Sequence, residues 1–301
     1  MDYKYLLGLE SKTYEHPSDK AALKALKAVP GLDTVTNFFL KWAYVQWQIV
    51  SLQGSCFQIT PESCCELYEL IKDVSNTLDV HPLPKLYTEW EYGINGYTTG
   101  YSEDVLMVLK SGAVDLLTPE ELRFVVGHEM GHVKSGHVLY HVMAQYINAA
   151  LSQLPLLGAL AEPLKFALLY WDRMSEFTAD RAGLLACQDL DVALNATIKM
   201  AGLPIKYFGT NVRDGFMKQA ESFQKDLSQF TDKAIKTLTI ATSTHPWTVM
   251  RAAQLIKWYE SGDYQAVLNG NAANLCVWPD CQQPVPQDSQ TCPHCGRPQN
   301  I

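Results

Sequence analysis

The stretch 118–134, TPEELRFVVGHEMGHVK, decides the fold expected around it. It opens with the pattern of a capping box, because Thr118 can cap a helix that has Pro119 in its first turn and Glu121 three residues after the cap. Apolar residues then recur at helical spacing. The stretch therefore predicts a single helix whose second half carries the motif His-Glu-x-x-His.

This motif occupies residues 128–132 and brings two histidines to one face of the helix, because residues four apart lie one turn above the other. Imidazole nitrogens at about 2.1 Å suit zinc. Glu129 is rotated by about 100° from His128, so we expect it to reach a water on the metal and not the metal itself. His128 and His132 are thus predicted zinc ligands, and Glu129 is the predicted general base.

A catalytic zinc takes three protein ligands and keeps one position open, so a carboxylate on a later helix would complete the set. Glu176 is the candidate, in the sequence SEFTAD of residues 175–180. Asp180 lies one turn further on the same face, from which it could orient a ligand histidine. The alternative is that both acids are solvated, or paired with Arg173 and Arg181.

Helical patterns dominate the beginning of the chain, including Glu62–Leu78, which follows a favourable Thr-Pro start. Residues 85–110 instead contain short β-prone runs separated by glycines, which predict a small sheet with an edge strand near Asn95. Further helices are expected over Asp172–Ala186 and from Pro246 to about residue 260. The fold class predicted is α+β and predominantly helical.

Four separated elements, in this order, carry a family resemblance: Asn95-Gly96-Tyr97, His128–His132, Glu176–Asp180, and His245-Pro246 with Arg251. The sequence resembles the HtpX-like and CaaX-prenyl-protease-like gluzincin metallopeptidases over about residues 60–260. The resemblance implies a zincin-type fold and peptide hydrolysis.

By the same resemblance, the edge strand at Asn95 and Gly96 would bind substrate. His245 would stabilise the oxyanion of the tetrahedral intermediate, and Arg251 would border the site and support the oxyanion or the substrate. A capping role at a helix start is the alternative for His245. Two further histidines, His137 and His141, lie four residues apart but have no obvious carboxylate partner in sequence. We therefore expect ordinary packing or surface residues, and a second metal site is the alternative.

The last part of the chain contains four cysteines in two pairs, Cys276 with Cys281 and Cys292 with Cys295. The second pair lies in a Cys-Pro-His-Cys-Gly knuckle, and the whole resembles a zinc ribbon. Four thiolates would close the coordination sphere, so this zinc is expected to be structural. Two zinc ions, one catalytic and one structural, are therefore predicted.

A chain of 301 residues can hold one large core and a small appendage. We expect a metallopeptidase domain over residues 1–268. Residues 269–301 would be a linker, around the Asn- and Gly-rich stretch 269–274, followed by the ribbon.

The net charge of −8, from 24 basic against 32 acidic side chains, argues against binding to nucleic acid. The start of the chain lacks a charged segment followed by an apolar run, so a cytoplasmic protein is expected. Polar residues and prolines interrupt Leu151–Tyr170, which favours a core helix over a membrane span. Peripheral membrane contact through this stretch is the alternative.

The function predicted is a zinc-dependent endopeptidase acting on proteins or peptides, with the attacking water activated by metal and by Glu129. The alternative is an inactive or weakly active peptidase scaffold that binds a protein partner through the ribbon. An intact set of ligands together with Glu129 favours the enzyme.

Overall fold

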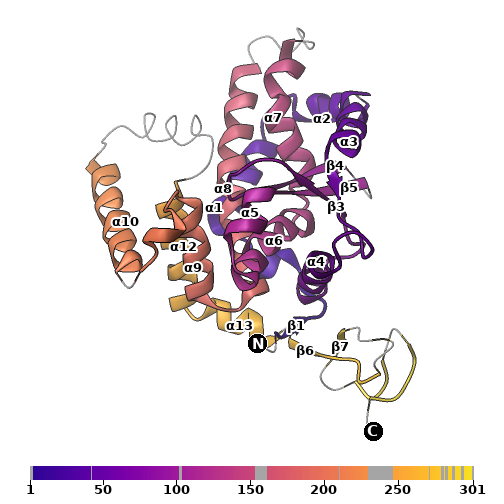
Figure 1. The fold of residues 1–301 in the computed structure, drawn as a ribbon. Helices are drawn as coiled ribbons and strands as arrows, with labels where there is room; N and C mark the ends of the chain where they lie inside the picture. The colour runs from indigo at the N-terminus through magenta and orange to yellow at the C-terminus, as the bar shows by residue number, and fades with distance from the viewer. Residues whose placement is uncertain are drawn as a thin grey trace.

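The computed structural model describes residues 3–299 apart from 42, 102–103, 153–160, 210, 230–246, 271, 279–280, 282–283, 287–288 and 293–294. It confirms a predominantly helical α+β fold with a small sheet (Figure 1). The helices are α1 (Pro17–Lys27), α2 (Leu32–Lys41), α3 (Ala43–Ser55), α4 (Cys65–Thr77), α5 (Ser111–Leu116), α6 (Pro119–Lys134), α7 (Val138–Ser152), α8 (Ala161–Cys187), α9 (Leu190–Met200), α10 (Val212–Gln229), α12 (Thr248–Glu260) and α13 (Asp263–Gly270). The strands are β1 (Tyr5–Leu6), β2 (Phe57–Gln58), β3 (Lys85–Glu89), β4 (Gly96–Tyr101), β5 (Asp104–Lys110), β6 (Ala272–Leu275) and β7 (Pro284–Pro286).

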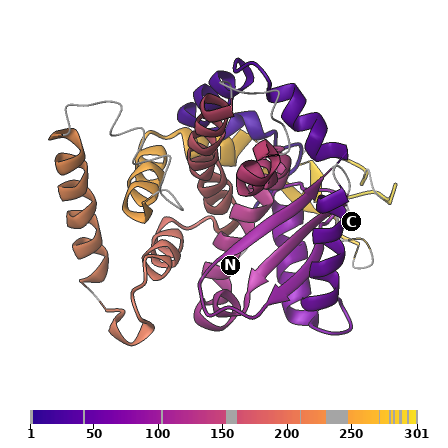
Figure 2. The ribbon, with the colours of Figure 1, turned by 90° about the horizontal axis from the view of Figure 1, so that it is seen from above.

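The larger sheet has the strand order β2-β3-β5-β4, with β3 parallel to β5 and β4 antiparallel to it. Side chains of β5 alternate between two hydrophobic clusters: Leu106 and Val108 belong to one, Met107 and Leu109 to the other. The sheet is therefore covered on both faces (Figure 2). Among the described strands β4 pairs with β5 alone, which confirms the predicted edge strand, and it packs against α6 and α7.

The predicted start of the catalytic helix is confirmed in detail. Thr118 Oγ1 accepts a hydrogen bond from the backbone N–H of Glu121, and the Glu121 carboxylate accepts one from the backbone N–H of Thr118. Both open N–H groups are thereby satisfied. The helix continues to Lys134, so the two motif histidines lie in its last two turns.

A seam of small residues sets the distance between α6 and α8. A Cβ atom built on Gly127 would lie 2.3 Å from the Cβ of Ala186, and one built on Gly131 would lie 2.6 Å from the Cβ of Ala182. From the other side, a Cβ on Gly183 would lie 2.7 Å from a backbone oxygen of α6. Only glycine allows the two backbones to approach this closely. Because the first two glycines directly precede His128 and His132 in sequence, the seam brings the motif up against α8.

Several element boundaries differ from the sequence predictions. The second site helix, expected over residues 172–186, begins eleven residues earlier as α8. The helix expected from Glu62 begins at Cys65, because Thr60 and Ser63 bond to each other in a preceding turn. Among the described residues, no helix combines the length and apolarity that a bilayer span requires.

The stretch 269–274, expected as a linker, is largely regular structure. It contains the end of α13 and most of β6. Strand β6 pairs with β1 near the beginning of the chain and with β7, forming a second, three-stranded sheet in which Leu6 pairs with Ala272. The sequence could not show this, since the partner strand lies at the far end of the chain. The division into domains at residue 268 stays a prediction.

Candidate metal centre

The three predicted ligands of the open site lie together between α6 and α8. The Nε2 atoms of His128 and His132 are 3.1 Å apart, and the Glu176 carboxylate oxygens lie 3.5 Å and 3.4 Å from these two nitrogens. Ligand atoms at about 2.1 Å from a tetrahedral zinc are separated by about 3.4 Å. The spacing of the three donors thus fits a single zinc ion.

The other ring nitrogen of each histidine has a partner of its own. His128 Nδ1 lies 3.1 Å from Asp180 Oδ1, and His132 Nδ1 lies 3.1 Å from His137 Nδ1. Both Nε2 atoms are therefore left to converge on the space beside Glu176. Two imidazoles, each oriented through its other ring nitrogen, and a carboxylate form a donor set that suits zinc.

Electrostatics in the metal-free site favour an ionised Glu176. Burial alone would raise the pKa of Glu176, but hydrogen bonds to His128 and His132 hold it well below its usual range. Burial and the nearby His141 lower the pKa of His132 far below its usual value, so His132 is neutral, as a metal ligand must be. Burial opposes protonation of His128 as well, yet the hydrogen bonds to Asp180 and Glu176 raise its pKa to about 9. A metal entering the site must therefore displace a proton from His128.

Glu129 is buried and lines a cavity of about 540 Å³ together with all three ligands. Burial raises the pKa of its carboxyl to about 7, although His128 opposes the shift. A Cβ atom built on Gly96 would lie 3.2 Å from Glu129 Cγ, so Glu129 stands directly beside β4. The side chain of Glu129 thus lies beside the edge strand and lines the same cavity as the ligands.

The cavity extends from the ligands along β4 and α7. Its walls include the two residues predicted to bind substrate, Asn95 and Gly96. Lys110 also lines the cavity, and its Nζ lies 2.6 Å from Glu89, so these two side chains form a charged part of the wall. An open cleft therefore runs beside the unpaired edge of the sheet.

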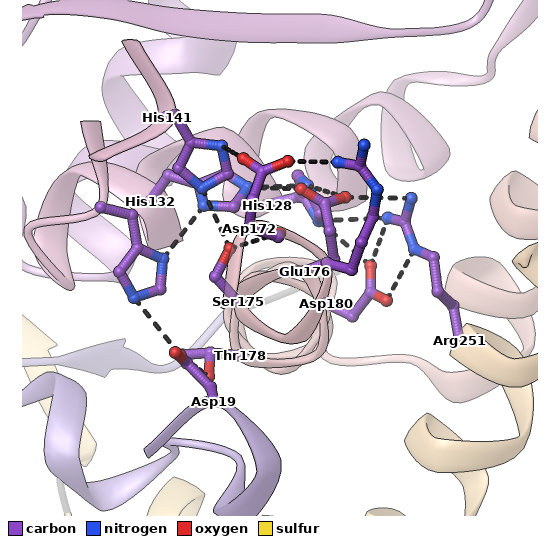
Figure 3. A network of polar contacts seen from close by, with 12 residues as sticks. Asp19, His128, His132, His141, Asp172, Ser175, Glu176, Thr178, Asp180 and Arg251 are labelled. Atoms are coloured by element: carbon purple, nitrogen blue, oxygen red, sulfur yellow. Dashed lines mark hydrogen bonds and ion pairs between the residues drawn. The ribbon is translucent and has the colours of Figure 1, made fainter. Parts of the chain in front are cut away.

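Arg251 borders the proposed ligands and is bound to carboxylates of α8. Its guanidinium donates to Asp180 from Nε at 2.8 Å and from Nη2 at 2.5 Å, and its Nη1 lies 3.4 Å from Glu176. The side chain is buried and is not among the described residues that line the cavity. Arg251 thus holds two carboxylates of the site, as its pairing with Asp180 in Figure 3 shows, and a role toward the oxyanion or the substrate stays a prediction. His245, the other residue expected here, lies outside the described residues, and its role stays a prediction.

Two histidines that looked unpartnered in sequence have carboxylate partners from distant elements. His137 Nε2 lies 3.3 Å from Asp19 in α1, and His141 Nδ1 lies 3.0 Å from Asp172 in α8. His141 also lines the cavity. The expectation of ordinary packing histidines is thus corrected for both. In the sequence, the only sign of their role was that His137 and His141 follow His132 closely, by five and nine residues. This spacing does not identify their carboxylate partners.

The four cysteines at the end of the chain lie together as predicted. The Sγ atoms of Cys276 and Cys295 are 3.8 Å apart, as are those of Cys281 and Cys292. Thiolates at about 2.3 Å from a tetrahedral zinc are separated by about 3.8 Å. All four sulfur atoms lie within 4.8 Å of one another, so the cluster fits a four-thiolate metal site.

Comparisons with known proteins agree with the geometry. The model of peptidase family M48 matches residues 65–259, which contain both helices of the open site. A plastoglobule-localized metallopeptidase 48 of Arabidopsis thaliana is 30% identical over 263 residues, 86% of this chain and 76% of that protein. HtpX protease homologues of Polynucleobacter necessarius and Ralstonia pickettii are each 24% identical, over 82% and 76% of this chain and 89% and 86% of theirs. The comparison with solved structures gave no match. The chain therefore belongs to peptidase family M48 and is an HtpX-like zinc metallopeptidase.

Proposed function

We propose that the chain is an endopeptidase in which His128, His132 and Glu176 hold the catalytic zinc and Glu129 is the general base. The observation that carries the proposal is the convergence of three ligand side chains and one further buried carboxylate on a single cleft. When bound, zinc would lower the pKa of a coordinated water and polarise the scissile carbonyl.

Glu129 would take the proton of the attacking water and pass it to the nitrogen of the leaving amine. Its pKa of about 7 in the metal-free site lies close to neutral pH, where a base that must later act as an acid works best. A nearby cation would lower this pKa, so that the carboxylate is ionised before the water attacks.

The edge strand supports a protein or peptide substrate. An extended peptide could add to the free edge of β4 through backbone hydrogen bonds, with Asn95 and Gly96 at its side. Backbone pairing carries no sequence information, so the cleft walls would select side chains. Lys110 and Glu89 place charge in one wall, which favours substrates with polar side chains at that position.

The test is hydrolysis of a mixed peptide library by zinc-loaded protein, compared with Glu129→Gln. The substitution should lower kcat/KM by about two to four orders of magnitude and leave the zinc content unchanged. Glu120→Gln, the same change in the first turn of the same helix but outside the cavity, should have no effect. Activity of Glu129→Gln close to wild type would remove Glu129 from the mechanism. Intact peptides after incubation with zinc-loaded wild type would contradict the endopeptidase proposal.

We further propose that the four-cysteine cluster holds a structural zinc. Its donor set leaves no position for water, and the cluster has no described contact with the cleft. Binding of a protein partner at this segment is compatible with such a role, since ribbons present an exposed surface around a closed metal site.

A further inference from the structure

Asp19 is a completely buried carboxylate in α1, outside the residues that the family model matches. It accepts hydrogen bonds from Thr178 Oγ1 at 2.5 Å and from Trp171 Nε1 at 2.9 Å, both in α8. His137 Nε2 lies 3.3 Å away on its third side. Burial raises the pKa of Asp19, but the bonds from His137, Thr178 and Trp171 outweigh it and hold the pKa below its usual range. Asp19 is therefore an ionised carboxylate that can only accept hydrogen bonds.

The ionised Asp19 determines which ring nitrogens of His137 and His132 carry protons. Because Asp19 only accepts, His137 must donate from Nε2, and Nδ1 is then the ring nitrogen that can accept a hydrogen bond from a neighbour. His137 Nδ1 faces His132 Nδ1 at 3.1 Å, so His132 must donate from Nδ1. The proton on Nδ1 leaves a lone pair on His132 Nε2, the atom that points to His128 and Glu176. Each nitrogen in the series has one role consistent with its neighbours.

We propose that Asp19 is a positioning residue of the metal centre: through His137 it fixes the tautomer and ring orientation of His132, so that Nε2 faces the metal. The inference rests on the proposed zinc site at His128, His132 and Glu176. It makes α1 part of the peptidase centre, although α1 contributes no ligand.

The two ligand histidines are thus supported in different ways. His128 is held directly by Asp180, whereas His132 is held by Asp19 through one intervening histidine. Helix α8 contacts both: it provides Asp180 on one side and, on another, Thr178, whose hydroxyl donates to Asp19 without touching His137 or His132 in any described contact (Figure 3). Helix α1 packs along α8, which keeps Asp19 at a fixed distance from the site.

A second metal ion is the competing explanation, since His132, His137 and His141 also have ligand atoms within 4.8 Å of one another. Hydrogen bonds explain this cluster without one. His137 is satisfied by Asp19 and His132, and His141 by Asp172 and by Ser175 Oγ at 3.0 Å. All four ring nitrogens of these two histidines have protein partners, so they need no metal.

Asp19→Asn is the sharpest change, because it keeps the shape of the side chain and adds a donor. An amide N–H facing His137 Nε2 would make this nitrogen an acceptor and place the proton on Nδ1. His132 would then have to accept at Nδ1 and carry its own proton on Nε2, where the metal should bind. We expect the affinity of the open site to fall by about ten- to a hundredfold.

The experiment is a Co²⁺ titration of full-length, metal-free protein, because sulfur-to-metal charge-transfer absorption separates the cysteine cluster from the open site. Asp19→Asn and His137→Leu should both weaken the open site, and the double variant should be no weaker than the worse single variant, since both break one series. Thr178→Val is the matched control: it removes one donor to Asp19 and leaves the path to His132 intact. Its affinity should stay within about twofold of wild type, while the Tm measured with chelator falls in all variants.

The outcomes separate this inference from the function on which it rests. If wild type binds no Co²⁺ that depends on His128, the proposed zinc site itself is wrong. If wild type binds but neither Asp19→Asn nor His137→Leu changes the affinity, Asp19 only packs α1 onto α8 and the inference is overturned. The inference is also overturned if the losses in the double variant are additive, or if Thr178→Val loses as much affinity as Asp19→Asn.

If Asp19→Asn does not fold, His137→Leu carries the test, because it keeps the bonds of Asp19 to α8. Loss of two equivalents of Co²⁺ in His137→Leu, with the cysteine bands unchanged, would instead establish a metal on the three histidines.

Discussion

The two metal-type clusters are organised by different amounts of protein. Behind His128 and His132 stand Asp180, His137 and, one step further, Asp19 and Arg251, all buried. Around the four cysteines, the described residues form a cluster of the cysteines themselves with Trp278 packed against them. The first site is shaped by the core of the domain, whereas the described part of the second has almost no core of its own.

The difference indicates, for each site, whether the polypeptide positions the metal or the metal organises the polypeptide. In the helical site the polypeptide positions the ligands, so the fold should persist when the metal is removed. In the cysteine segment the metal must organise the polypeptide, since a small segment without a core is unfolded in its metal-free form. The predictions below test this contrast, from the largest expected effect to the smallest.

The largest effect is expected from replacing Cys292 and Cys295 with serine. Zinc binding contributes about 10–16 kcal/mol to the folding of small four-ligand domains at neutral pH. The double variant should therefore lose one zinc and become open to rapid proteolysis in the segment that carries the four cysteines. Hydrolysis of a short peptide should remain within about twofold of wild type. If loss of this zinc abolished hydrolysis while the open site stayed loaded, the two clusters would not be independent.

The seam between α6 and α8 predicts the next effect. Gly131→Ala should destabilise the protein by about 1–3 kcal/mol, because the added methyl group would lie 2.6 Å from the Cβ of Ala182 and force the helices apart. Gly215→Ala in α10 is the control: it has the same gain in helix propensity, but nothing lies within 4 Å of the new atom. It should be neutral or stabilising by up to about 1 kcal/mol. Urea unfolding measures both, and equal values would show that the seam is not tight.

Asp180 offers a direct test of the support behind His128. Asp180→Asn should weaken zinc at the open site by about ten- to a hundredfold, since a neutral amide no longer draws the Nδ1 proton of His128. Chelator competition measures the affinity, and the cysteine cluster in the same molecule is the internal reference. An unchanged affinity would show that packing alone holds His128.

The smallest effect concerns pH. The pKa of His128 in the metal-free site is about 9, and zinc binds only the neutral ring. Between pH 7 and pH 8 His128 is therefore mostly protonated in the metal-free site. Because zinc must displace this one proton, zinc affinity should rise about tenfold over this interval. Above pH 9 the rise should level off, because His128 is then already neutral. An affinity independent of pH between 7 and 8 would show that no proton is displaced from His128.

Much of the helical site could be predicted from sequence, because its signals are local. The capping box, the histidines four apart and the pair Glu176 and Asp180 each lie within one or two turns of a single helix. Helical geometry alone then fixes which side chains share a face. The structure brings these residues together in the expected places.

The remainder depends on contacts between distant parts of the chain. Nothing near His137 in sequence points to Asp19, and nothing near Arg251 shows that Asp180 would occupy its guanidinium. In the sequence, the glycines that precede the motif histidines look like ordinary helix positions. The structure shows that they are needed because α8 packs too close to leave room for a side chain. The strand in residues 272–275 was missed in the same way, since its partner β1 lies at the beginning of the chain.

That last pairing has a consequence for biosynthesis. Leu6 leaves the ribosome early and Ala272 late, and at about 5–20 residues per second the interval between them is on the order of tens of seconds. Throughout this time β1 has no partner strand, whereas α6 and α8 are both complete once Cys187 has been made, well before Ala272. The two helices of the open site can therefore pack against each other on the nascent chain before the three-stranded sheet closes.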